Sequence, residues 1–399
     1  MTNAFKAVKI SNSVYWVGAI DWKLRNFHGY ETSRGSTYNA FLIISDKITL
    51  IDAVKSNFYD EMISRIASVI DPSKIDIIVS NHSEMDHTGS LPRLIKEVKP
   101  EKIVASPKGV TALYEHFKWD VEVDAVKTGD TLDIGNGTLK FIETRMLHWP
   151  DSMFTFFEEE GILFTNDAFG MHLATGERFA DEIDPWILDY EGAKYYANII
   201  LHLSPIVKRL LDSLPGLNLD IKMLAPDHGP VWRKNISWII DKYASWAEQK
   251  PTKKAVIVFD TMWGSTATMA AAVADGLTEA GAYTKLLPLD GVHRSDVITE
   301  ILDAGALIVG SPTINNQIYP TVADVMNYLK GLKPQNLKGA AFGSFGWSGE
   351  AVKQLNTILN EMNIDIVSDG IRIKYVPTDE DLENCRNLGL KIGKSILEL

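Results

Sequence analysis

The sequence predicts two domains in tandem, an α+β domain of packed sheets with helices outside and then an α/β domain with a doubly wound parallel sheet. Strand-like runs dominate up to about residue 250, and strands and helices alternate regularly after it. Residues 249–254 are polar and carry a proline after a helical run, which is typical of a linker. A chain of 399 residues also exceeds what one core usually organises. We therefore expect domains at residues 1–250 and 251–399.

The first domain combines many strand-like runs with fewer helix-like runs. The strand-like runs are residues 14–20, 40–44, 48–53, 75–80, 102–105, 139–143, 154–157 and 162–165. The helix-like runs are residues 59–70, 110–117, 193–214 and 236–248. This pattern favours sheets packed together with the helices on their outer faces.

The second domain repeats a strand–helix unit. Buried strands are expected at residues 255–259, 283–288, 306–309, 340–342 and 364–371. Helices are expected at residues 266–280, 296–303, 321–329, 350–363 and 380–397. Such alternation is typical of a parallel sheet with right-handed crossovers.

Composition excludes several classes of partner. The formal net charge of -12 disfavours nucleic acid and anionic membrane surfaces. No apolar stretch approaches the roughly 18 residues of a membrane span, and the first residues lack the apolar core of a signal peptide. The only cysteine is Cys385, so the chain can form neither an internal disulfide nor a cysteine-ligated iron centre. We expect a cytoplasmic protein.

Four potential metal ligands occupy six consecutive positions: His82, Glu84, Asp86 and His87. In an extended segment, alternate side chains point to one side, so the first three could converge while His87 reaches in as the chain turns. One metal ion rarely takes four ligands from so short a stretch, and the pattern therefore indicates a two-metal site. Oxygen and nitrogen donors without thiolate suit iron or manganese better than structural zinc.

Further candidate ligands, His148, Asp167 and His228, stand after predicted strands. Side chains at strand ends are held by a rigid sheet, which gives a preorganised site. Lone histidines inside helical patterns, such as His116 and His202, are expected to be structural instead.

Three loops of the second domain leave the carboxyl ends of predicted strands, where doubly wound sheets bind ligands. The loop after residues 255–259 is rich in small and hydroxyl residues and suits a single phosphate at a helix N-terminus. It matches neither the nucleotide loop with lysine nor the Gly-x-Gly-x-x-Gly dinucleotide motif. Trp263 and Trp347 offer faces for a flat ring, although either could cap the core. The set resembles flavodoxin, which binds FMN. The candidate FMN-binding residues are Thr261, Met262, Trp263, Gly264, Ser265, Thr266, Thr313, Ile314, Asn315, Asn316, Ser344, Phe345, Gly346, Trp347 and Ser348.

The combined pattern resembles the flavodiiron proteins, also called A-type flavoproteins. That resemblance implies an N-terminal metallo-β-lactamase-like αββα sandwich followed by a flavodoxin-like domain. Hydrolases of the lactamase-like superfamily usually have histidine where this chain has Glu84, and they bind zinc. The resemblance implies a centre of two non-haem irons held by seven ligands. One iron is held by His82, Glu84 and His148, the other by Asp86, His87 and His228, and Asp167 bridges them.

The same resemblance suggests residues near the irons that could donate a proton or a hydrogen bond to the substrate. These catalytic candidates are His172, Tyr196 and His28, and family members also have similar residues around Tyr30 and Tyr195. His172 is the strongest because it follows Asp167 by only five residues. Each of them could equally be a packed core residue.

The resemblance implies an oxidoreductase that reduces nitric oxide to nitrous oxide at the diiron centre, which FMN re-reduces. Reduction of dioxygen to water is the close alternative, because the ligand set is shared. Family members form head-to-tail homodimers, and a dimer of dimers is also compatible. With one cysteine, no rubredoxin module can be built, so we expect an external rubredoxin or another small redox protein as donor. A zinc hydrolase with an accessory flavodoxin domain and a non-enzymatic gas sensor or electron carrier are the remote alternatives.

Overall fold

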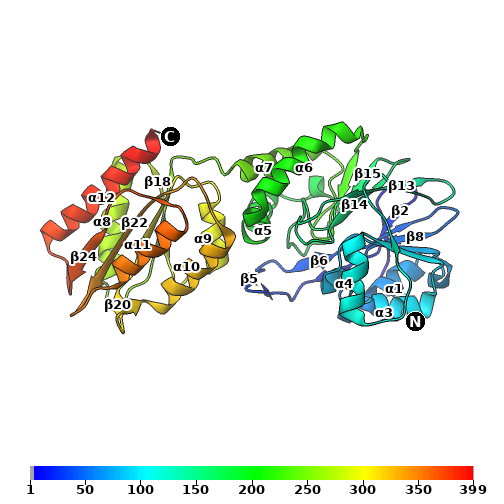
Figure 1. Ribbon diagram of the computed structural model, residues 1–399, viewed down its shortest axis with the longest axis horizontal. Coiled ribbons are helices and arrows are strands. Elements are labelled where there is room, and N and C mark those ends of the chain that lie inside the picture. The colour runs from blue at the N-terminus through cyan, green and yellow to red at the C-terminus, as the bar shows by residue number, and fades with distance from the viewer. Residues whose placement is uncertain (1–3, 399) are drawn as a thin grey trace. The chain divides into compact units, whose positions relative to one another are not determined.

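The computed structural model describes residues 4–398, which form two compact units (Figure 1). The first unit runs up to Tyr195 and resumes over Pro205–Ala244. The second contains the short segment Tyr196–Ser204 and everything described from Ser245 onward. Among the described residues, no helix is long and apolar enough to span a bilayer.

The first unit is built on two sheets that face each other. The larger sheet has the strand order β1 (Val8–Lys9), β2 (Val14–Trp16), β7 (Phe41–Ile43), β8 (Thr49–Ile51), β9 (Ile77–Ser80), β10 (Lys102–Ala105) and β11 (Asp124–Ala125). The smaller sheet has the order β12 (Thr131–Asp133), β13 (Thr138–Glu143), β14 (Met153–Phe157), β15 (Ile162–Phe164) and β16 (Met223–Ala225). Their inner faces share one apolar core, in which Phe41 of the larger sheet packs against Phe164 of the smaller at 5.2 Å.

Helices cover both outer faces of this pair of sheets. The larger sheet carries α1 (Tyr59–Ala67), α3 (Leu91–Val98) and α4 (Pro107–Phe117), whose apolar residues join its outer core. Beside the smaller sheet lie α5 (Pro185–Tyr195), α6 (Ser204–Ser213) and α7 (Ile236–Glu248) (Figure 1). The predicted αββα sandwich is confirmed.

One predicted helix is wrong as a continuous element. The run at residues 193–214 is divided into the end of α5, a π-helical turn over Tyr196–Ile200, a 3-10 turn over Leu201–Leu203, and α6. Apolar periodicity does not reveal such breaks, but Pro205 does favour a helix start, since its ring removes a backbone donor that the first turn leaves free. The break matters because it separates the neighbours Tyr195 and Tyr196 between the two units.

Two predicted strands are likewise divided. The run at residues 14–20 becomes β2 and β3 (Ala19–Asp21), and β3 pairs with β6 (Ser36–Tyr38) in a separate ribbon. The run at residues 364–371 becomes β23 (Asp365–Ile366) and β24 (Ile371–Lys374), both parallel to the same neighbour, β22.

The second unit is the predicted doubly wound parallel sheet. Its order is β18 (Tyr283–Pro288), β17 (Lys254–Phe259), β19 (Ala306–Gly310), β22 (Lys338–Phe345) and β23, with β24 also on β22. One face is covered by α8 (Ser265–Glu279) and α12 (Asp379–Leu397), and the other carries α9 (Arg294–Ile301), α10 (Pro320–Leu332) and α11 (Ala351–Glu361) (Figure 1). Helices α8 and α12 meet through glycines, because a Cβ on Gly276 would overlap the carbonyl oxygen of Arg386.

Candidate metal centre and cofactor cavity

The loop that leaves β9 carries the first ligands and is fixed by a buried carboxylate. Asp52 accepts hydrogen bonds from the backbone and side-chain nitrogens of Asn81, each at 2.7 Å. His82 follows directly, and Glu84 keeps an extended backbone just before the short helix α2 (Met85–Thr88). The prediction of an extended segment is therefore wrong beyond Glu84. The helical turn carries Asp86 and His87 away from Glu84, so these ligands enter a different group.

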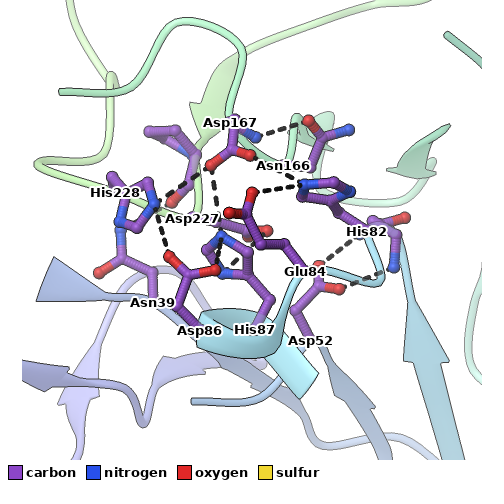
Figure 2. Close-up of polar contacts among 12 residues, drawn as sticks. Asn39, Asp52, His82, Glu84, Asp86, His87, Asn166, Asp167, Asp227 and His228 are labelled. Carbon is purple, nitrogen blue, oxygen red and sulfur yellow. Dashed lines mark hydrogen bonds and ion pairs between the residues drawn. The ribbon is translucent and has the colours of Figure 1, made fainter. Parts of the chain in front are cut away.

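The seven predicted ligands come together in two groups, and Figure 2 labels all of them except His148. One contains His82, Glu84, His148 and Asp167, and the other contains Asp86, His87 and His228. Within the first, a Glu84 oxygen lies 3.4 Å from the Nε2 atoms of both histidines. Within the second, the two Asp86 oxygens lie 3.4 and 3.3 Å from the Nε2 atoms of the two histidines. All four imidazoles thus present Nε2 inward.

Asp167 divides its carboxylate between the two groups. Its Oδ2 atom lies 2.8 Å from His148 Nε2 and 3.3 Å from His82 Nε2. Its Oδ1 atom lies 3.3 Å from His87 Nε2 and 3.2 Å from His228 Nε2. Such a carboxylate can bind one metal ion with each oxygen.

The residues fit two cations. Within residues 4–398, both oxygens of Asp86, both ring nitrogens of His87 and Oδ1 of Asp167 are buried without a hydrogen-bond partner. Burying such groups unpaired is costly, and a metal ion would satisfy them. Four imidazole nitrogens and three carboxylates, with no thiolate, suit iron.

Electrostatics also draw positive charge to this position. Burial opposes protonation of His82, but its contacts with Asp151 and Glu84 outweigh burial and raise its pKa to about 10. Burial likewise opposes ionisation of Asp167, but the charge of His87 and a hydrogen bond from His148 hold its pKa well below the usual range. The carboxylates at this position therefore favour positive charge in the centre.

The outward nitrogens of three ligands each face an acceptor, and those of His82 and His228 lie within hydrogen-bond distance of it. His82 Nδ1 lies 3.1 Å from Asp151, His87 Nδ1 lies 3.6 Å from Asp227, and His228 Nδ1 donates to the Thr37 carbonyl at 2.6 Å. Such partners orient a ligating imidazole and select its tautomer. Sequence reasoning missed Asp151 and Asp227, although each lies within three residues of a predicted ligand.

These two carboxyls differ in charge. Burial opposes ionisation of Asp151, but hydrogen bonds from His82 and Ser83 lower its pKa to about 2, so it stays a carboxylate. Burial raises the pKa of Asp227 well above its ordinary range, and nearby Asp52 adds to the effect.

His172 lies beside the centre. Its ring is 4.6 Å from that of His228 and 5.1 Å from that of Tyr195. Burial and the charge of His228 hold its pKa well below the usual range, so the ring is neutral. Burial and the charge of Asp167 raise the pKa of Tyr195, so its phenol keeps its proton.

The two other catalytic candidates have different surroundings. His28 is 77% exposed at the tip of the hairpin formed by β4 (Asn26–Phe27) and β5 (Tyr30–Glu31), with Nε2 3.6 Å from Glu84. Tyr196 instead bonds the Ser204 hydroxyl at 3.0 Å and packs on Trp246 at 5.3 Å. Tyr195, not Tyr196, contacts the rings of the metal centre, and the two neighbours belong to different units.

The second unit has a cavity of about 370 Å³ at the carboxyl ends of β17, β19 and β22. It is lined by Met262, Trp263, Ser265, Pro312, Thr313, Asn315, Asn316, Ser344, Phe345, Gly346, Trp347, Ser348, Tyr375 and Val376. Trp263 and Trp347 are 91% and 85% exposed, which shows that neither caps the core.

Several predicted cofactor residues support the cavity without lining it. Thr261 accepts a hydrogen bond from the Gly264 backbone at 3.1 Å, and the Thr266 hydroxyl lies 2.9 Å from that of Ser344. Ile314 is also absent from the lining. Pro312, Tyr375 and Val376 were missed, and the last two follow a short strand with little sequence signal. Hydroxyls, backbone donors and exposed aromatic faces together fit a phosphate-bearing flat ring such as FMN.

Comparisons with known proteins cover both units. The family model "ODP family beta lactamase" matches residues 37–229, and the flavodoxin model matches residues 257–389. The nitric oxide reductase of Moorella thermoacetica is 45% identical over 98% of this chain and 99% of its own length. The rubredoxin oxygen:oxidoreductase structure from Desulfovibrio gigas is 44% identical, covers 98% of this chain and 99% of its own, and has a TM-score of 0.97. The flavodiiron protein structure from Giardia intestinalis is 36% identical, covers 98% and 97%, and has a TM-score of 0.95.

Proposed function

This chain belongs to the flavodiiron protein family, and from that premise we propose that it reduces nitric oxide to nitrous oxide at the centre around Asp167. The observation that carries the proposal is the division of the Asp167 carboxylate, one oxygen toward each group of ligands. Metal pairs held in this way are spaced by roughly 3.5–4 Å, a gap that suits a small diatomic molecule.

The seven ligands are proposed in two sets. One ion is held by His82, Glu84 and His148, the other by Asp86, His87 and His228, and Asp167 is shared. When bound, the irons supply the redox site for the gas and FMN in the second unit supplies the electrons.

The protein's own groups hold hydrogens near that site. Reduction of nitric oxide to nitrous oxide and water consumes protons, and the neutral ring of His172 and the protonated phenol of Tyr195 are buried beside the ligands. His28 offers a third donor from the exposed hairpin. We propose these three as the residues that hydrogen-bond the bound gas.

Dioxygen reduction to water is the second candidate function. It is favoured by the likeness to the rubredoxin oxygen:oxidoreductase, while the likeness to the nitric oxide reductase favours the first. Steady-state turnover of each gas with one reduced donor separates the two. A rate for dioxygen far above that for nitric oxide would reverse the order.

The electron donor is proposed to be a rubredoxin or another small redox protein that reduces FMN. The name of the Desulfovibrio gigas relative supports this class, and exposed Trp263 and Trp347 leave the cavity rim open to a partner. Stopped-flow reduction of the bound flavin by rubredoxin tests it directly.

We also propose a head-to-tail homodimer, which would let the flavin of one subunit serve the irons of the other. Sedimentation velocity of the holoprotein checks the dimer. Turnover in mixtures of one variant lacking metal and one lacking FMN checks the exchange. Activity recovered in such mixtures supports it, and complete inactivity contradicts it.

Metal analysis distinguishes the proposed reductase from the remote alternative, a zinc hydrolase. An anaerobic count of iron, zinc and FMN per chain should find iron and FMN. Zinc in place of iron would contradict the whole proposal.

A further inference from the structure

The proposed ligand His228 lies in a segment, residues 226–229, that belongs to no helix or strand. Such a segment keeps its position only through the groups to which its backbone is bonded, because it has no ladder or helical turn of its own. In this protein most of those groups come from the end of β6 and the residue after it, Thr37 and Asn39.

Asn39 is fully buried and forms three hydrogen bonds to the segment. Its side-chain nitrogen Nδ2 donates to the carbonyl oxygen of Pro226 at 2.6 Å and to that of Gly229 at 2.9 Å. Its backbone nitrogen donates to the carbonyl oxygen of Asp227 at 2.7 Å. Since these bonds fall on both sides of His228 in the chain, they hold the backbone of the ligand from two directions.

The orientation of the Asn39 amide is fixed by its third neighbour, Trp16. The indole nitrogen Nε1 of Trp16 donates to Oδ1 of Asn39 at 2.8 Å. An indole nitrogen can only donate and a carbonyl oxygen can only accept, so the amide fits its surroundings in one orientation. Trp16 is itself held by the guanidinium groups of Arg65 and Arg178, whose central carbons lie 4.6 and 4.5 Å from its ring centre.

Thr37 and close packing complete the attachment of the segment. The Thr37 hydroxyl oxygen accepts a hydrogen bond from the backbone nitrogen of Gly229 at 2.7 Å. Gly229 has a φ of +78°, and a Cβ at this position would meet the carbonyl oxygen of Met171 at 2.9 Å. The segment therefore has little room to move while these bonds are formed.

This attachment bears on one of the two groups of ligands. We call Asp86, His87 and His228 the His228 group, and His82, Glu84 and His148 the His148 group. In the His228 group the first two ligands come from the single short helix α2, and only His228 comes from elsewhere in the chain. Its Nε2 atom lies 3.3 Å from Asp86 and 3.2 Å from Asp167. The completeness of this group therefore depends on where the segment of residues 226–229 is held.

We propose that Asn39 is a positioning residue that holds His228 in place for the metal ion of the His228 group, without binding that ion itself. The proposal deepens the reductase function and rests on it for the two-metal centre. It involves no bond that is made or broken in turnover.

The first test measures ferrous binding to each group. Full-length protein that carries FMN but no metal is titrated anaerobically with ferrous ion by calorimetry. We expect Asn39→Ala to weaken one of two ferrous ions about 10–100-fold and to leave the other at the wild-type affinity. The same exchange should have no further effect in His228→Ala, which already lacks the ligand, but should keep its effect in His148→Ala. Equal weakening of both ions, no weakening, or a full effect in His228→Ala would overturn the proposal.

The control separates positioning from a general loss of stability. Val14→Ala truncates a fully buried side chain of β2, the strand that also carries Trp16. It should lower the free energy of unfolding and leave both ferrous affinities at the wild-type values. A selective loss of one ion in Val14→Ala would show that any core defect has this effect, and the proposal would fail.

The second test follows the segment without metal or turnover. In the metal-free full-length protein, the amides of Asp227 and Gly229 donate to Asn166 and to Thr37, and hydrogen exchange reports whether these bonds open. We expect exchange at both amides to be faster in Asn39→Ala. Exchange at Asn81, whose amide donates to Asp52 at 2.7 Å, should not change. Unchanged exchange at Asp227 and Gly229 would contradict the proposal.

Thr37→Val keeps the question open to experiment if Asn39→Ala does not fold. It removes only the hydroxyl that accepts from Gly229, and it should weaken the same ferrous ion about 3–10-fold. If the wild type reduces neither gas, the proposed function fails, while ferrous titration and hydrogen exchange still decide the role of Asn39. If the wild type turns over and Asn39→Ala binds both ferrous ions normally, only the positioning role fails.

Discussion

Replacing Glu84 with histidine should turn the proposed iron centre toward zinc. Glu84 places one oxygen 3.4 Å from both His82 Nε2 and His148 Nε2, and the other 3.6 Å from His28. An imidazole at this position would restore the ligand that zinc hydrolases of the lactamase-like superfamily have. The side chain is at the rim of the centre and is 13% exposed, so the fold should tolerate the exchange.

The size of the effect follows from charge. Glu84 is one of three carboxylates in the ligand set, so the exchange removes one of three negative charges. Unit charges about 4 Å apart attract by roughly 4 kcal/mol at an effective dielectric constant of 20. The incoming imidazole offsets part of this lost attraction, because its nitrogen can itself bind the metal ion. We therefore expect iron affinity to fall about 10–100-fold, or about 1.4–2.8 kcal/mol.

The assay is metal competition. Apoprotein is reconstituted anaerobically with equal amounts of ferrous and zinc ions, and bound iron, zinc and FMN are counted before nitric oxide turnover is measured. Glu143→His is the matched control, since Glu143 is a carboxylate of the same unit with the same 13% exposure. Glu84→His should gain zinc and lose turnover while keeping FMN, and Glu143→His should match the wild type. Wild-type iron content and turnover in Glu84→His would refute a ligand role for Glu84.

Three further predictions concern the surroundings of the two sites. Asp151→Asn should weaken iron binding about 10–100-fold, because it removes the charged acceptor of His82 Nδ1. Metal titration measures the iron affinity, and an unchanged affinity would contradict this prediction. Trp347→Ala should loosen FMN or shift its potential without changing iron content, because the indole is exposed at the cavity; flavin fluorescence and anaerobic redox titration decide. Gly276→Ala should lower the free energy of unfolding by about 1–3 kcal/mol, because its Cβ would overlap the carbonyl oxygen of Arg386. Urea denaturation measures this change. An unfolding free energy equal to that of the wild type would show that α8 and α12 can move apart at little energetic cost.

The sequence was enough for both folds and for the identity of the proposed ligands. Alternation of strands and helices is a local property, and so is the spacing of His82, Glu84, Asp86 and His87. Local patterns also placed the three loops that surround the cofactor cavity, since loops after parallel strands meet at one sheet edge.

The sequence failed where residues meet through long-range contacts. Periodicity predicted one helix over residues 193–214, but a π-helical turn divides it. Tyr195, and not the predicted Tyr196, lies beside His172. Tyr375 at the cavity was also missed, because β24 is short and its pairing with β22 is a long-range contact that the local sequence pattern does not indicate.

By itself the sequence determined which side chains could hold two metals and a flavin, because residue type and spacing fix donor chemistry. Only the tertiary structure decided how they are used. It assigned one oxygen of Asp167 to each group, gave His82 the partner Asp151, and placed the Asn39 amide against the segment that carries His228. These pairings join atoms far apart in the chain, and their distances depend on how the two sheets pack, which no local pattern records.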